Sequence, residues 1–294
     1  MAEPQDLFCT SHDGRLQLHG GAYGPADASR TLLCLHGLTR NSLDFDALAR
    51  RLSDAGERVL SFDQRGRGRS AWDDDAANYR LDVYARDMLG VLDQLGVKRA
   101  VLVGTSMGGL MSMLMASSAP ERVAAIVLND IGPEIDPRGV ERIRGYVGKR
   151  PAPGDWDEAA RTIARDNAAV FPDYGHDDWL AAARRTFVED AEGRLAAAYD
   201  PAIAVGLEPD EEAPAAPDLW PVWDALQALP ILAIRGELSD ILSPSTLEQM
   251  AARHPGLQTA VAPRRGHAPM LDEPAALAAI DRFLASLPDI EAPS

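Results

Sequence analysis

Apolar residues of the chain first alternate with polar ones and then gather into short runs. Between residues 7 and 23 the alternation surrounds Asp13-Gly14, which predicts an antiparallel hairpin at a sheet edge. Nearly continuous apolar runs follow at 31–35, 58–62, 100–103, 123–128, 231–235 and 258–261. Such runs are typical of strands that are buried on both faces.

Helical patterns separate these runs. Helices are expected at 42–54, 79–95, 107–118, 243–253 and 274–286. In the first three, apolar side chains recur at intervals of three and four residues, as on the buried face of a helix. Strand and helix therefore alternate, which predicts an α/β fold with a mainly parallel sheet.

Residues 133–224 interrupt this alternation. The segment is helical by propensity, is broken by Pro and Gly, lacks β-branched runs, and includes an expected loop at 211–217. We therefore predict a helical cap at 133–224, inserted into a core formed by 1–132 and 225–294. Most of the large aromatic residues fall in this cap: Trp156, Phe171, Tyr174, Trp179, Phe187, Trp220 and Trp223. Each is expected to pack within the cap, and some of them to line an apolar pocket beneath it.

Composition narrows the class of protein further. The chain has 294 residues, of which 46% are hydrophobic, enough for one large core and one catalytic domain. Its 45 acidic and 29 basic residues give a net charge of -16, so a nucleic acid is not an expected partner. The amino terminus has no signal-peptide pattern, and no segment is apolar for about 18 residues, so we expect a soluble, cytoplasmic protein with no membrane partner. Cys9 and Cys34 lie in separate apolar runs and are predicted to be small core residues.

Candidate chemistry begins at Gly104–Gly109, between a predicted strand and a predicted helix. A serine on such a sharp turn adopts a strained backbone, and larger residues two positions before or after it would collide with the neighbouring backbone. Gly104 and Gly108 meet this requirement. We therefore predict Ser106 as the nucleophile.

A serine hydroxyl needs a base to take its proton and a carboxylate to orient that base. His267 is the predicted base, because it alone among the six histidines follows the last predicted strand, in a loop that can bend over the strand ends. Asp240 is the predicted acid, because it follows the strand that precedes the strand of the histidine. Glu237 suits a turn role better. Asp130 also follows a strand and remains the alternative acid.

An oxyanion is best held by two backbone amides. The amide of Met107, directly after the serine, is one candidate, and the amide of Leu38, after the first buried strand, is the other. His36 is predicted to tie down the loop that carries Leu38. The segment 63–70 is rich in Gly and Arg but lacks the lysine and following helix of a phosphate-binding loop, so we interpret it as a tight loop with a surface charge cluster.

Together these motifs resemble, in order and over nearly the whole chain, those of the α/β-hydrolase family. The matching elements are His-Gly at 36–37, Asp-x-Arg-Gly-x-Gly-x-Ser at 63–70, the serine turn at 104–109, Gly-x-x-x-Asp at 236–240 and Gly-His at 266–267. The resemblance implies a mainly parallel eight-stranded sheet with helices on both faces and a cap inserted after the sixth strand. It also implies hydrolysis through an acyl-enzyme, with no organic cofactor and no metal.

The resemblance leaves the substrate open. Haloalkane dehalogenases and epoxide hydrolases of this fold carry an aspartate at the turn, so Ser106 argues against them. We expect a carboxylic-ester or lactone hydrolase that acts on a small apolar substrate. Carbon-carbon bond hydrolysis, perhydrolysis and a slow-turnover ligand receptor of the same fold are the alternatives. Carbon-carbon hydrolases often hold a substrate carboxylate with an arginine; Arg184 and Arg185 could do so, although a solvated surface position is the simpler interpretation.

Overall fold

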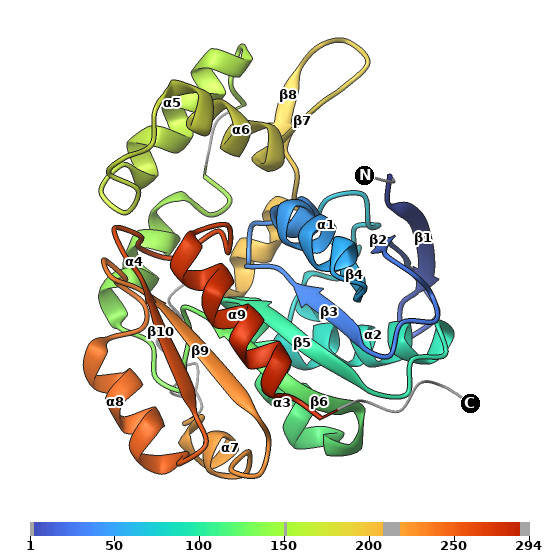
Figure 1. The fold of residues 1–294 in the computed structure, drawn as a ribbon. Coiled ribbons are helices and arrows are strands. Elements are labelled where there is room, and N and C mark those ends of the chain that lie inside the picture. The colour runs from blue at the N-terminus through green and yellow to red at the C-terminus, as the bar shows by residue number, and fades with distance from the viewer. Residues whose placement is uncertain (1–2, 150–151, 208–217, 289–294) are drawn as a thin grey trace.

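An eight-stranded sheet forms the centre of the molecule (Figure 1). The structure is a computed structural model and describes residues 3–149, 152–207 and 218–288. Along the sheet the strands are β1 (Gln5–Thr10), β2 (Gln17–Tyr23), β4 (Arg58–Phe62), β3 (Thr31–Leu35), β5 (Ala100–Thr105), β6 (Val123–Asn129), β9 (Ile231–Gly236) and β10 (Gln258–Ala262). β1 pairs with β2, and β2 with β4, antiparallel, and every other pair is parallel. The predicted edge hairpin and mainly parallel sheet are confirmed.

Helices cover both faces of this sheet. They are α1 (Asp46–Asp54), α2 (Leu81–Gln94), α3 (Met107–Ser118), α8 (Pro244–Arg253) and α9 (Pro274–Ser286), with short 3-10 turns at Ser42–Phe45, Ala76–Asn78 and Pro120–Arg122. The side chains of β3 alternate between two cores: Leu33 and Leu35 pack with α2 and α3, whereas Leu32 and Cys34 pack with α1 and α9. This alternation follows from the two-residue period of a strand, and it explains why the run is apolar throughout.

The chain between β6 and β9 contains α4 (Pro137–Tyr146), α5 (Trp156–Asn167), α6 (His176–Thr186), β7 (Phe187–Glu189), β8 (Leu195–Ala197), a 3-10 segment (Pro201–Leu207) and α7 (Trp220–Asp224). Figure 1 shows α5, α6, β7 and β8 as a separate layer above the strand ends, whereas α7 lies at the opposite end of the sheet, near α8. We keep the name cap for 133–224 as our interpretation of this segment. The hairpin of β7 and β8 was not predicted, because its strands have only three residues each. The loop expected at 211–217 lies outside the described residues.

Burial of the aromatic residues divides this segment. Phe171, Trp179 and Phe187 belong to a small core made by α5 and α6, with Trp156 and Tyr174 packed against it. In contrast, Trp223 is fully buried in the core that includes α2 and α3, and Trp220 packs against that core, so the prediction that these two pack within the cap is wrong. Cys9 and Cys34 are buried free thiols, as predicted. Among the described helices, none is both long and apolar enough to cross a membrane.

Candidate active site

Ser106 occupies the turn between β5 and α3. Its backbone has φ 54° and ψ -116°, in the left-handed half of conformational space that non-glycine residues rarely adopt. A Cβ at Gly104 would lie 2.3 Å from the carbonyl oxygen of Gly108, and one at Gly108 would lie 1.9 Å from that of Leu35. Only glycine fits at both positions, as the sequence argument required.

His267 lies in the loop between β10 and α9, and its ring reaches the serine. The distance from His267 Nε2 to Ser106 Oγ is 2.8 Å. The side chain of His267 is 8% exposed, so the ring is largely shielded from water. The structure thus brings together the two residues that were predicted as nucleophile and base.

Asp130 is the carboxylate that contacts the histidine. Its Oδ2 lies 2.9 Å from His267 Nδ1. An ionised carboxylate only accepts hydrogen bonds, so Nδ1 carries the proton and Nε2 is left free to accept one from Ser106. Asp130 is fully buried and is held by two further donors, the amide of Gly236 at 2.8 Å and the hydroxyl of Ser239 at 2.6 Å. These contacts fix the carboxylate in position.

The prediction that Asp240 is the partner of His267 is therefore wrong. The Asp240 carboxylate pairs instead with Arg142 of α4, with Nε to Oδ2 at 2.5 Å and Nη2 to Oδ1 at 2.9 Å. Burial raises the pKa of Asp240, but the hydrogen bonds and charge of Arg142 outweigh burial and leave this pKa below its ordinary value. In the loop after β9 it is Ser239, one residue earlier, that turns toward the site. Glu237 accepts a hydrogen bond from the amide of Arg264, in keeping with its predicted turn role.

Two backbone amides near Ser106 are free to bind an oxyanion. Met107 opens α3, so its N–H has no partner within the helix. In the described part of the chain, no hydrogen-bond acceptor is found for the amide of Met107 or of Leu38. The peptide that carries the Leu38 amide is fixed through its carbonyl, because His36 Nδ1 donates to the Gly37 oxygen at 2.7 Å. The roles of both amides remain predictions.

His36 has the structural role predicted for it. It is fully buried, and its Nε2 accepts a hydrogen bond from the amide of Gln64 at 2.9 Å. Burial lowers the pKa of His36 to about 4. The ring is thus neutral near pH 7 and can donate from one nitrogen and accept at the other.

The interpretation of 63–70 as a surface charge cluster needs correction. Arg65 and Arg67 are fully buried. The Arg65 guanidinium donates to Asp87 Oδ2 at 2.7 Å and to Asp73 Oδ2 at 2.6 Å. Arg67 donates from Nε to the carbonyl of Leu38 at 3.0 Å. The loop therefore supports the site from inside the protein, through carboxylates that lie outside the motif itself.

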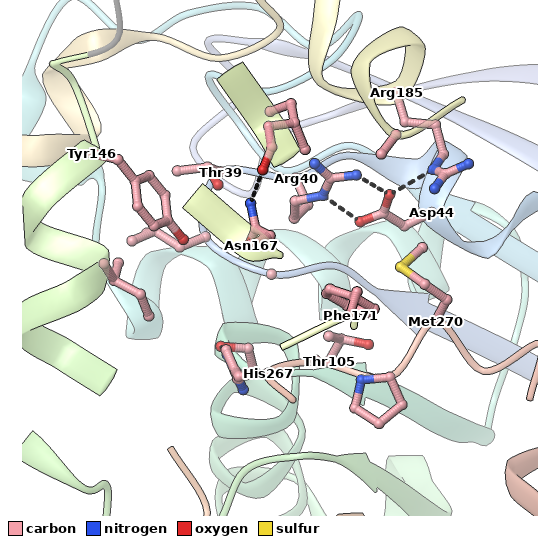
Figure 2. A pocket seen from close by; sticks show the side chains of 18 of the residues that line it. Thr39, Arg40, Asp44, Thr105, Tyr146, Asn167, Phe171, Arg185, His267 and Met270 are labelled. Atoms are coloured by element: carbon pink, nitrogen blue, oxygen red, sulfur yellow. Dashed lines mark hydrogen bonds and ion pairs between the residues drawn. The ribbon is translucent and has the colours of Figure 1, made fainter. Parts of the chain in front are cut away.

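Ser106 and His267 belong to the lining of a cavity of about 130 Å³, which Figure 2 shows from close by. It is lined by Gly37, Leu38, Thr39, Arg40, Asp44, Phe45, Thr105, Ser106, Ile143, Tyr146, Ile163, Asn167, Phe171, Tyr174, Trp179, Ala182, Arg185, His267, Ala268, Pro269 and Met270. Phe171, Tyr174 and Trp179 pack against one another, with ring centroids 4.7 to 6.3 Å apart. The expectation that some aromatic residues of the predicted cap line a pocket is confirmed.

The same cavity contains an ion pair. Arg40 Nε and Nη2 donate to the two carboxylate oxygens of Asp44 at 2.7 and 2.5 Å. Burial disfavours both charges, but their mutual attraction dominates, so the pKa of Asp44 is lowered and that of Arg40 is raised. Both groups are therefore charged near pH 7. Among the described residues, no three His, Cys, Asp or Glu side chains are grouped so as to hold a metal ion.

Comparisons with known proteins place this geometry in context. A family model described as alpha/beta hydrolase fold matches residues 30–274. The chain is 34% identical to a 3-hydroxybutyrate-oligomer hydrolase of Cupriavidus necator over 94% of this chain and 95% of that protein. It is 29% identical to a 2-(acetamidomethylene)succinate hydrolase of Mesorhizobium japonicum, over 80% and 81%. A crystal structure of an alpha/beta hydrolase from Novosphingobium aromaticivorans, 46% identical, has a TM-score of 0.89 and covers 97% of this chain and 99% of its own.

Proposed function

Because the chain belongs to the alpha/beta hydrolase fold family, we propose that this hydrolase cleaves a short carboxylic ester through an acyl-enzyme formed on Ser106. The observation that carries the proposal is the continuous hydrogen-bonded path from Ser106 through His267 to the buried Asp130. A path of this kind deprotonates a serine at neutral pH and stabilises the imidazolium that results.

The proposed reaction has two halves. Ser106 Oγ attacks the ester carbonyl while His267 Nε2 takes the hydroxyl proton, and the amides of Leu38 and Met107 stabilise the oxyanion. Collapse of this intermediate breaks the bond to the alcohol, which leaves with the proton from His267. A water molecule then attacks the acyl-enzyme with the same base, and the acid departs as Ser106 regains its proton. Throughout, Asp130 accepts the hydrogen bond of His267 Nδ1 and does not take its proton.

The size of the cavity and the relatives support a short ester. A volume of about 130 Å³ is close to that of a cavity of about 150 Å³ that accommodates benzene, so an acyl or alcohol part of a few carbon atoms fits. The relative from Cupriavidus necator is described as a hydrolase of 3-hydroxybutyrate oligomers, which are themselves esters of short hydroxy acids. We propose the same bond type for this chain.

A series of p-nitrophenyl esters with acyl chains of increasing length tests the proposal. We expect many turnovers per enzyme molecule, with kcat/KM highest for short chains, and loss of turnover in Ser106→Ala. A fluorophosphonate should label Ser106, as peptide mapping would reveal. Labelling of another residue would refute the assignment of the nucleophile. A single slow turnover would instead favour the receptor alternative, and preferential cleavage of vinylogous diketones would favour carbon-carbon hydrolysis.

A further inference from the structure

The cavity is lined by more arginine than carboxylate side chains. Among the described residues that line it, the guanidinium groups of Arg40 and Arg185 face the single carboxylate of Asp44. The excess positive charge lies in a chain whose net charge is -16. A cavity for purely apolar esters has no need of it, because each buried charge costs desolvation free energy.

The two arginines differ in how their donors are used. Arg40 binds both oxygens of Asp44 and also donates from Nη1 to Thr186 Oγ1 at 2.5 Å. In contrast, Arg185 Nε lies 3.5 Å from Asp44 Oδ1, an ion-pair distance without a hydrogen bond. Although this nitrogen is buried, it has no hydrogen-bond partner. A buried charged donor without an acceptor is costly, so an acceptor from a ligand would be stabilising.

The side chain of Arg40 lies close to Ser106. A Cβ placed on Gly37 would lie 3.4 Å from Arg40 Cγ and 3.7 Å from Ser106 Cβ, so the stem of Arg40 and the nucleophile flank the same glycine. Figure 2 shows Arg40, Asp44 and Arg185 linked in a row, with His267 elsewhere in the same cavity. A short substrate can therefore reach both the serine and the arginines.

We propose that Arg185, supported by Arg40, binds a free carboxylate of the substrate, so that the preferred substrates are short esters with a carboxylate at one end. This inference rests on the proposed ester hydrolysis and adds the substrate class. Guanidinium and carboxylate form paired, charge-assisted hydrogen bonds, which are stronger than neutral ones.

Two matched ester pairs test this inference. In the first, 3-acetyloxybutanoate is compared with its amide, 3-acetyloxybutanamide. In the second, monomethyl glutarate is compared with methyl 5-amino-5-oxopentanoate. The measured quantity is the ratio of kcat/KM for the carboxylate ester to that for the amide. We expect the wild-type ratio to exceed about tenfold in at least one pair, as one charge-assisted hydrogen bond implies.

Arg185→Gln should lower that ratio at least about tenfold, mainly through KM, while Arg185→Lys should give an intermediate ratio because it keeps the charge. Arg184→Gln is the matched control, since Arg184 lies on the same helix but stacks on the Trp156 ring at 4.9 Å. It should leave the ratio within about twofold. Equal ratios for wild type and Arg185→Gln, or an equal loss in Arg184→Gln, would overturn the inference.

Calorimetry on Ser106→Ala separates this inference from the proposed function. The variant should bind monomethyl glutarate more tightly than the amide, and Arg185→Gln in the same background should abolish the difference. If the wild type hydrolyses neither monomethyl glutarate nor its amide but this binding preference is found, the carboxylate site is supported and the proposed ester hydrolysis is refuted. Hydrolysis of both esters without discrimination, and without a binding preference, would leave the esterase in place and refute the site.

Discussion

Replacing Asp130 by Asn tests the acid of the proposed triad most directly. The side chain keeps its shape but loses its charge and gains a donor. In the native site Asp130 accepts three hydrogen bonds, from His267, Ser239 and the amide of Gly236. An Asn amide can accept hydrogen bonds only at its oxygen. Its NH₂ group would therefore either face one of the other donors or face His267, and in the second case the histidine must carry its proton on Nε2. That tautomer cannot accept the proton of Ser106.

The expected loss of kcat follows from a precedent and from the burial of Asp130. In the serine-protease precedent, the same substitution lowers kcat by about 10⁴ because the histidine takes the wrong tautomer. Here we expect a loss of kcat between about 10² and 10⁴, since Asp130 is fully buried and no water can replace its charge. Asp240→Asn is the matched control. It weakens the ion pair with Arg142, in which each side chain is 25% exposed, and should change kcat less than about tenfold.

Both variants should first be compared with the wild type by circular dichroism, and then assayed on the best p-nitrophenyl ester. We expect normal folding for both variants, a large loss of kcat in Asp130→Asn and a near-normal kcat in Asp240→Asn. The reverse order would return the role of the acid to Asp240 and refute the triad that we infer from the hydrogen bonds.

Three further predictions concern residues around the triad. Ser239→Ala removes the 2.6 Å hydrogen bond to Asp130 and should lower kcat about tenfold with little change in KM; an unchanged kcat would deny it a positioning role. Gly108→Ala places a methyl group 1.9 Å from the carbonyl oxygen of Leu35 and should lower the free energy of unfolding, measured in urea, by about 3 kcal/mol or more; wild-type stability would contradict this. The lowered pKa of His36 means that the unfolded chain binds a proton below about pH 6.5 that the folded chain refuses until about pH 4. Unfolding free energy should therefore fall by about 2 kcal/mol more in the wild type than in His36→Asn between about pH 7 and about pH 5, and equal slopes would refute the assignment.

Sequence patterns predicted the sheet and its helices, and they indicated Ser106 as the proposed nucleophile, because each of these depends on local rules. The apolar runs coincide with strands that are buried on both faces, and the helix expected at 107–118 is α3. Gly104 and Gly108 flank Ser106 because the turn tolerates nothing larger, and this steric rule can be read from three residues. The edge hairpin around Asp13-Gly14 is equally local.

The acid could not be chosen in the same way, because Asp130 and Asp240 both follow strands and both lie between serine and histidine in chain order. The strands that precede Asp240 and His267, β9 and β10, do pair as neighbours in the sheet. However, β9 also pairs with β6, on the side away from β10, so the end of β6 is a neighbour of the site as well. Asp130 follows β6 directly and adopts φ 58°. That backbone conformation, and the contact of Asp240 with Arg142, decide which side chain reaches His267. Neither is visible in a one-dimensional pattern.

The burial of Arg65 and Arg67 was missed for a related reason. An arginine in a glycine-rich loop is usually solvated, and burial becomes tolerable only when partners are in place. The shortest contacts of Arg65 are with Asp73 and Asp87, and Asp87 lies 22 residues along the chain, in α2. Only the folded chain brings these charges together.

The end of β6 connects the parts of the site. Asn129 Nδ2 donates to Thr105 Oγ1 at 3.0 Å and to the carbonyl of Pro269 at 2.8 Å, so it links the strand of the nucleophile to the loop of the histidine. The next residue, Asp130, binds the histidine itself. Two consecutive residues thus set the relative positions of all three members of the proposed triad.

The loop that carries His267 is attached to the helical layer as well as to the sheet. The amide of Gly266 donates to the carbonyl of Val170, which lies after α5, at 2.7 Å. The donors to Asp130, in contrast, come from the last residue of β9, from the loop after it and from His267 itself. A shift of the helical layer that carries Val170 would therefore act on the orientation of His267 while the carboxylate stays in place. In this arrangement the sheet and the loop after β9 determine where Asp130 lies, whereas the position of His267 depends on both layers of the protein.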